Sequence, residues 1–171
     1  MNQSISKKIE SKINEDLSPT KNITGLHLKI VAAIAIIWSL FQLWYASPFP
    51  FMFNIGMFKG LPARAIHLGF ALTLAFLIFP ISKKKKISLL DIFISFIAIF
   101  CCLYIYFFYD QLVDRGGVLL NVSLGQNIII PIELIIGTIG ILILLEATRR
   151  AIGLPLVIIA SCFLLFSYFG K

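Results

Sequence analysis

One glutamate and two arginines separate two long apolar runs near the carboxyl end of the chain, in the stretch LEATRRAIGLP from Leu145 to Pro155. Arg149 and Arg150 follow Glu146 by three and four residues, so a helix would bring either arginine beside this carboxylate. Charges are costly within hydrocarbon and therefore mark an edge, a partner or a site. Two interpretations stay open: the arginines end a helix at the membrane surface, or arginine forms a bidentate clamp to a neighbouring subunit.

The two histidines, His27 and His67, are the side chains that would suit a haem or quinone site. His27 precedes the first apolar run, and His67 lies in the first turn of the second expected helix, so we expect them at opposite membrane surfaces. Hydrocarbon about 30 Å thick would then separate the two rings. One subunit could not place both on a single iron, so the sequence favours two interfacial polar residues.

Glu133 is the only acid well inside an expected membrane span, and such a carboxylate would suit a proton or sodium relay. Pro131 precedes it by two residues. A helix that starts at this proline would place Glu133 in its first turn, where a carboxylate interacts favourably with the helix dipole. The sequence favours this structural interpretation, because the 16 residues from Glu133 to Arg149 alone extend roughly 24 Å.

The sequence carries no motif of an enzyme. Cys101, Cys102 and Cys162 lie inside apolar runs, without a C-x-x-C pair or a neighbouring histidine, which disfavours a zinc site. A P-loop, a G-x-G-x-x-G, an H-E-x-x-H and a nucleophile elbow are all missing from the sequence. We therefore expect no enzymatic activity, and no cofactor or metal bound to this chain.

The composition, which is rich in apolar residues and poor in charged ones, indicates the environment of the chain. Of the 171 residues, 59% are hydrophobic and 13% are charged, against about 45–50% and about 25% in soluble domains. A chain of this size cannot enclose that much apolar surface in its own core, which predicts a membrane protein surrounded by lipid. The net charge of +7 arises from lysines and arginines beside the apolar runs, which is typical of contact with anionic lipid headgroups rather than nucleic acid.

The apolar runs predict an all-α integral membrane protein: a bundle of four transmembrane helices plus a fifth, shorter helix at the carboxyl end. The expected helices cover residues 28–46, 63–81, 89–109, 127–149 and 154–169, and a polar loop covers 110–126. The membrane domain spans residues 28–171. Residues 1–27 repeat an apolar side chain every four positions, so they form either an amphipathic helix on the membrane surface or a solvated tail.

Residues 47–62 fit neither a spanning helix nor a polar loop. Three prolines and two glycines interrupt this stretch, yet it also contains four phenylalanines. We interpret it as a loop or short helix that either lies in the interface at the outer surface of the bilayer or packs against a partner.

The lysines and arginines predict the orientation of the bundle. With a cytoplasmic amino terminus, eleven of the 15 lysines and arginines fall on the cytoplasmic side, including Lys83 to Lys86, Arg149 and Arg150. Such an excess is the signature of cytoplasmic segments. We therefore expect a multi-pass protein of the bacterial inner membrane with its amino terminus in the cytoplasm.

Several segments together resemble one family of transporters. LLEATRRAIGLPLVIIASCFLLFSYFG (residues 144–170) and LPARAIHLGFALTLAFLIFP (residues 61–80) are similar to the fused permeases of tripartite ATP-independent periplasmic (TRAP) transporters that work with TAXI-type binding proteins. LWYASPFP and the loop bordered by four lysines occur in the same order along the chain as in those permeases. The resemblance covers most of residues 28–170 and corresponds to the small, amino-terminal membrane part of those permeases.

The resemblance implies a small membrane subunit of a secondary importer. In this family a periplasmic protein delivers the substrate, and a large permease carries the transport site and uses a sodium gradient. The sequence stops at Lys171, before the large part, so we expect either that the large part is a separate partner chain or that this chain is a fragment or a split form. A membrane anchor of an electron-transfer enzyme and a self-contained small carrier are the alternatives.

The family's ion and substrate sites lie in the large part, so the resemblance transfers none of them to this chain. We expect five residues that match the family's motifs to position helices or to form a subunit interface: Arg64, His67, Glu146, Arg149 and Arg150. The stretch 47–62 would dock the periplasmic binding protein through Phe51, Phe53 and Lys59.

Overall fold

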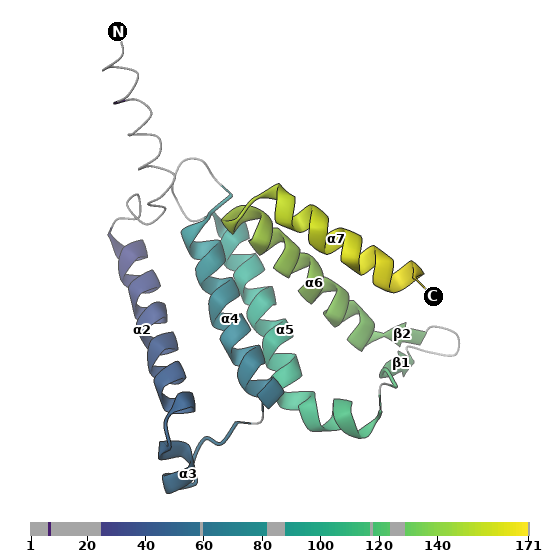
Figure 1. The fold of residues 1–171 in the computed structure, drawn as a ribbon, viewed down its shortest axis with the longest axis horizontal. Coiled ribbons are helices and arrows are strands. Elements are labelled where there is room, and N and C mark those ends of the chain that lie inside the picture. The colour runs from purple at the N-terminus through teal and green to yellow at the C-terminus, as the bar shows by residue number, and fades with distance from the viewer. Residues whose placement is uncertain are drawn as a thin grey trace.

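The computed structural model describes Lys7 and residues 25–58, 60–81, 88–116, 118–123 and 129–170, with the backbone only for 121–123, 129 and 130. Figure 1 shows a helical bundle whose long helices alternate in direction. The elements in chain order are α2 (Leu26–Ala46), α3 (Phe49–Phe53), α4 (Gly60–Ile78), α5 (Leu89–Asp114), β1 (Asn121–Ser123), β2 (Ile129–Pro131), α6 (Ile132–Ala151) and α7 (Leu154–Phe169).

Helix α4 lies at the centre of the bundle, packed against α2, α5 and α6. The main core joins α4, α5 and α6 through Leu72, Phe76, Ala98, Cys102, Ile143 and Ala147. Small side chains let the helices approach: a Cβ built on Gly69 of α4 would lie 3.4 Å from the Cβ of Cys102 on α5. Close packing of this kind is how helices associate in lipid, where the hydrophobic effect gives no net drive.

The two flanking helices are far less buried than this central block. Helix α2 has one buried residue, Val31, which packs with Leu74 and Leu77 of α4. Helix α7 contacts α6 and has no buried residue. Both helices therefore expose apolar side chains along their length.

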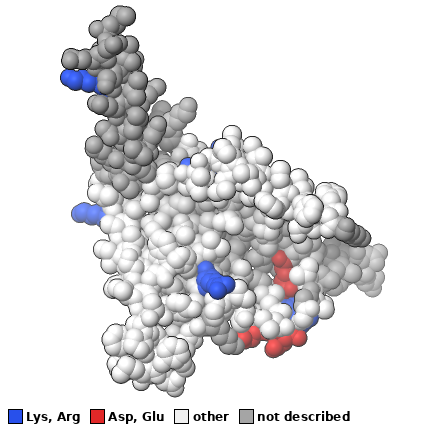
Figure 2. All heavy atoms as spheres, viewed as in Figure 1, with Lys and Arg blue, Asp and Glu red and all other residues white. Residues whose placement is uncertain are grey.

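Three helices in the described part of the chain are long and apolar enough to cross a membrane: α2, α4 and α5. Helix α6 has 20 residues but carries two acids and two arginines, and α7 has 16 residues. In Figure 2 the visible face is almost entirely uncharged, with isolated basic side chains and a small group of acidic ones near the hairpin. The protein thus has the transmembrane character that its composition predicts.

The ends of the helices gather at two opposite ends of the bundle. At one end, which we name the Arg150 end, α4 and α6 finish while α2, α5 and α7 begin. At the other end, the α3 end, α2 finishes beside α3, α4 begins, and α5 leads to the β-hairpin. The number of spans and the orientation of the bundle in the membrane stay predictions. Most of the predicted segment 1–27, Lys59 and Lys83 to Lys86 lie outside the described residues.

The observed helices differ from the expected ones mainly at the α3 end. Helix α4 begins at Gly60, earlier than the expected residue 63, because a proline is tolerated within a first helical turn. Helix α5 continues to Asp114 although the hydropathy falls near residue 109. The first strand of an antiparallel hairpin lies in the expected polar loop 110–126, with Asn121 paired to Pro131 and Val122 to Ile130. The second strand, β2, occupies the start of the expected helix 127–149, so α6 begins at Ile132 and not at residue 127, because proline is suited to the start of a helix. These two short strands are an addition to the all-α architecture that the sequence predicts.

Candidate functional site

A buried ion pair at the Arg150 end joins two helices that are distant in the sequence. Asp91 stands in the first turn of α5, and its side chain is completely buried. An Nη1 atom of Arg150, from the last turn of α6, donates a hydrogen bond to Asp91 Oδ1 at 2.6 Å. The Arg150 side chain is only 5% exposed. This pair fixes the start of α5 against the end of α6.

Backbone groups complete the environment of Asp91. The Ser88 side chain accepts a hydrogen bond from the Leu90 N–H, and Asp91 Oδ2 accepts one from the Ser88 N–H at 3.3 Å, which together form a capping box. The N–H of Ile81, beyond the end of α4, donates to Asp91 Oδ1 at 3.3 Å. One carboxylate therefore holds the end of α4, the start of α5 and the end of α6 together.

Arg150 is the centre of the cluster on the α6 side. Its Nε donates to Glu146 Oε1 at 2.7 Å, and its guanidinium carbon lies 4.9 Å from the ring centroid of Phe76 on α4. Phe76 is fully buried, so the arginine packs on an aromatic face that water does not reach. Its Nη2 atom is buried without a hydrogen-bond partner among the described residues.

Arg149 occupies the solvent or lipid side of the same cluster. Its Nε and Nη2 donate to the two oxygens of Glu146 at 2.7 and 2.8 Å, so the bidentate pair lies within α6. The Arg149 side chain is 47% exposed. Both arginines thus contact Glu146, as the spacing allows, but among the described helices only Arg150 reaches a second one. We define the Arg150 cluster as Asp91, Glu146, Arg149 and Arg150.

A second cluster ties α5 to α6 at the α3 end. Pro131 is the N-cap of α6, so Glu133 stands in the first turn, as the structural interpretation of this residue predicts. Its carboxylate accepts hydrogen bonds from the Tyr104 hydroxyl at 3.2 Å, from Arg115 Nη2 at 2.5 Å and from the Leu120 N–H at 2.7 Å. We define the Glu133 cluster as these four residues. Three donors hold the carboxylate, which suits a fixed joint better than a relay.

His67 contacts α2 and not His27. Trp38 Nε1 donates to His67 Nδ1 at 3.3 Å, and Gln42 Nε2 contacts the same nitrogen. Because α4 begins at Gly60, His67 lies about two turns inside the helix and not in its first turn, which corrects our expectation. Its partners follow His27 by 11 and 15 residues, roughly 17–22 Å along α2 at 1.5 Å per residue. The separation is smaller than expected but still excludes a shared iron.

The remaining predicted site residues lie apart from both clusters. Arg64 is exposed on α4, with no hydrogen bond or ion pair to the residues that the structure describes. Phe51 and Phe53 are exposed on α3, while Lys59 lies outside the described residues. Sequence reasoning missed Asp91, Tyr104 and Arg115 as partners. The position of Asp91 in the first turn of its helix was the only signal for any of them.

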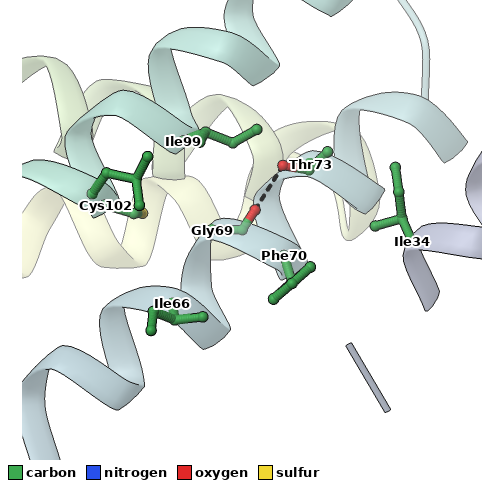
Figure 3. A pocket seen from close by; sticks show the side chains of 8 residues that line it. Ile34, Ile66, Gly69, Phe70, Thr73, Ile99 and Cys102 are labelled. Atoms are coloured by element: carbon green, nitrogen blue, oxygen red, sulfur yellow. Dashed lines mark hydrogen bonds between the residues drawn. The ribbon is translucent and has the colours of Figure 1, made fainter. Parts of the chain in front are cut away.

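The cavity between α2, α4 and α5 offers little polar chemistry. Figure 3 shows this cavity of about 270 Å³, where the Thr73 hydroxyl points to the Gly69 carbonyl and donates a hydrogen bond to it at 2.7 Å. Its other lining side chains are apolar apart from Cys102. Within the described residues, no three His, Cys, Asp or Glu side chains are grouped so that they could hold a metal ion.

The two ion-pair clusters therefore constitute the candidate functional site, and their chemistry is structural: they fix helix ends. No protein-family model, curated protein or solved structure matches this chain. The resemblance to TRAP permeases stays a prediction that rests on the quoted sequence segments.

Proposed function

We propose that this protein is a rigid membrane scaffold, the small subunit of a TRAP importer that holds a separate large permease in the bilayer. The observation that carries this proposal is the fastening of α5 to α6 at both ends, by the Arg150 cluster and the Glu133 cluster. A periplasmic substrate-binding protein and a sodium gradient belong to the same proposal. They would act with the large permease, in the bacterial inner membrane.

Rigidity follows from the cost of breaking the buried pair. Removing one partner of such a pair costs about 3–5 kcal/mol, because the other charge stays buried without compensation. A carrier that moved α5 past α6 in each cycle would have to separate Asp91 from Arg150, Glu133 from Arg115, or both. The arrangement therefore supports a scaffold against which a partner moves, and it disfavours a self-contained carrier.

The outer faces of the bundle support a role within a larger assembly. Helix α7 has no buried residue, and α2 buries only Val31. Lipid can cover such surfaces, and so can the helices of another membrane protein. In the proposed topology α6 is a fourth span and α7 a fifth helix, with the Arg150 end in the cytoplasm. This orientation follows from the excess of basic residues on that side.

A disulfide between α5 and α6 tests whether these two helices have to move relative to each other. A Cβ built on Gly140 of α6 would lie 3.9 Å from the Cβ of Cys101 on α5, within the range of about 3.5–4.5 Å that a disulfide requires. Gly140→Cys, made with Cys162→Ser to remove an exposed thiol, should therefore form this bridge on oxidation. Gly137→Cys is the matched control, because a Cβ there has no neighbour within 4 Å.

The bridged protein is then reconstituted in liposomes with the proposed partners, a large TRAP permease and a periplasmic binding protein from the same organism. We measure the entry of radioactive sodium on addition of the binding protein and substrate, before and after reduction. A scaffold predicts equal sodium entry in the bridged and reduced states, and none when this chain is omitted. Entry that appears only after reduction would contradict the rigid scaffold, and entry with this chain alone would favour the self-contained carrier.

A further inference from the structure

The segment from Ser47 to Phe58 presents an exposed apolar surface at the α3 end. It contains no charged residue. Phe51 is 76% exposed and Met52 is 72% exposed, and Phe53, Ile55 and Met57 are exposed as well. Large apolar side chains in this number do not face water without a partner.

The segment is built firmly onto the end of α2. The Phe49 ring stacks between those of Trp44 and Phe53, with centroid distances of 6.4 and 6.1 Å. Asn54 then takes the left-handed conformation with φ of 54°, and the chain turns back over Trp44 at Gly56. A Cβ on Gly56 would lie 3.1 Å from Trp44 Nε1. The exposed side chains are therefore presented by a fixed turn.

The exposed face of this segment is continuous with the exposed side of α2. An open hollow of about 690 Å³ lies between α2 and the returning chain. Its lining is apolar apart from the indole N–H of Trp44, and includes Ile37 and Leu40 from the middle of α2, Phe49 from α3, and Ile55 beyond it. Since α2 is long and apolar enough to cross a membrane, the hollow leads from its hydrocarbon-facing side to α3.

We propose that α3 and the turn as far as Phe58 bind lipid at the outer surface of the bilayer that α2 crosses, and anchor α2 there, with an acyl chain in the hollow. A surface that binds and releases a soluble protein normally has a polar rim, and this segment supplies no charge. Aromatic rings beside an apolar helix end are typical of the interfacial belt of membrane proteins. This inference is the alternative to the predicted docking of the binding protein through Phe51, Phe53 and Lys59, which stays a prediction.

Nitroxide labels measure the depth of this surface directly. Met52→Cys is made in the full-length protein with Cys162→Ser, because Cys101 and Cys102 are buried. The protein is reconstituted in vesicles of phosphatidylethanolamine and phosphatidylglycerol. Collision rates of the label with oxygen, which concentrates in hydrocarbon, are compared with those of a water-soluble nickel chelate. Ile37→Cys on the exposed side of α2 and Asp114→Cys at the end of α5 serve as hydrocarbon and water references.

We expect the label at position 52 to collide with the nickel chelate severalfold less often than the label at position 114. Its collision rate with oxygen should lie between the rates at positions 37 and 114. A nickel rate equal to that at Asp114 would overturn the inference. If the binding protein then lowered that rate, the surface would belong to protein docking instead. The inference depends on the membrane position of α2 and not on the transporter, so the sodium-entry experiment can fail while this one succeeds.

Discussion

Replacement of Arg150 by methionine is the most direct test of the buried cluster. The change removes the 2.6 Å hydrogen bond to Asp91, one of the two arginines on Glu146 and the contact with the Phe76 ring. Methionine fills a similar volume, so the main effect is the uncompensated charge of a carboxylate with no exposed surface. Breaking a buried pair in this way costs about 3–5 kcal/mol. Since about 1.4 kcal/mol is a factor of ten, the folding equilibrium falls by roughly two to four orders of magnitude.

The assay is reversible unfolding in mixed micelles. Helicity is followed by circular dichroism while the mole fraction of a denaturing detergent increases. Arg149→Met is the matched control, because it removes the other arginine that pairs with Glu146, at an exposed position where ion pairs contribute little. A double variant, Arg150→Met with Asp91→Asn, removes both buried charges and keeps a side-chain oxygen that can accept from the Ser88 and Ile81 N–H groups. It should recover much of the stability lost in the single variant, because no uncompensated charge then stays buried.

Two results would refute this reasoning. Equal losses of stability for Arg149→Met and Arg150→Met would mean that burial of Arg150 does not determine its contribution. A double variant with Asp91→Asn that is no more stable than Arg150→Met alone would mean that the unpaired carboxylate is not the source of the loss.

Three further predictions concern the other parts of the bundle. Glu133→Leu leaves Arg115 without its partner, so amide hydrogen exchange should rise in the first turn of α6, and Tyr104→Phe should raise it less. Gly69→Ala should be tolerated, because the new Cβ meets α5 at 3.4 Å, whereas Gly69→Leu should separate α4 from α5 and lower the yield of monodisperse protein. The purified protein should show no Soret band, and a band that His67→Ala abolished would favour the electron-transfer anchor instead.

The helices could be predicted from the sequence because hydropathy and proline act locally. The apolar runs gave the approximate extent of α2 and α4, and α7 begins and ends where it was expected. Pro131 marked the start of α6, as the structural interpretation of Glu133 required, whereas the apolar run placed that start too early, at residue 127. Hydropathy reports which residues avoid water and not where a helix ends, however, so the extension of α5 to Asp114 was not predicted.

The clusters could not be predicted in full because they depend on tertiary packing. Glu146 and its arginines are neighbours on one helix, and their spacing gave the local pairs. Asp91 and Arg150 are 59 residues apart in the sequence, so no local pattern joins them. The same holds for Glu133 and Arg115, which an unpredicted hairpin brings together.

The placement of the two clusters follows from the physics of a helix in lipid. Apolar side chains fill the middle of the bundle, where dispersion contacts and small residues bring helices close but specify their register weakly. Charges at mid-membrane would cost more than they contribute, whereas near the ends of the helices they meet free backbone groups such as the Ile81 and Leu120 N–H. Ion pairs at the ends of α5 and α6 therefore fix a register that the apolar middle leaves open. A block fixed in this way has little freedom to move internally, and this is the physical basis of the proposed scaffold role.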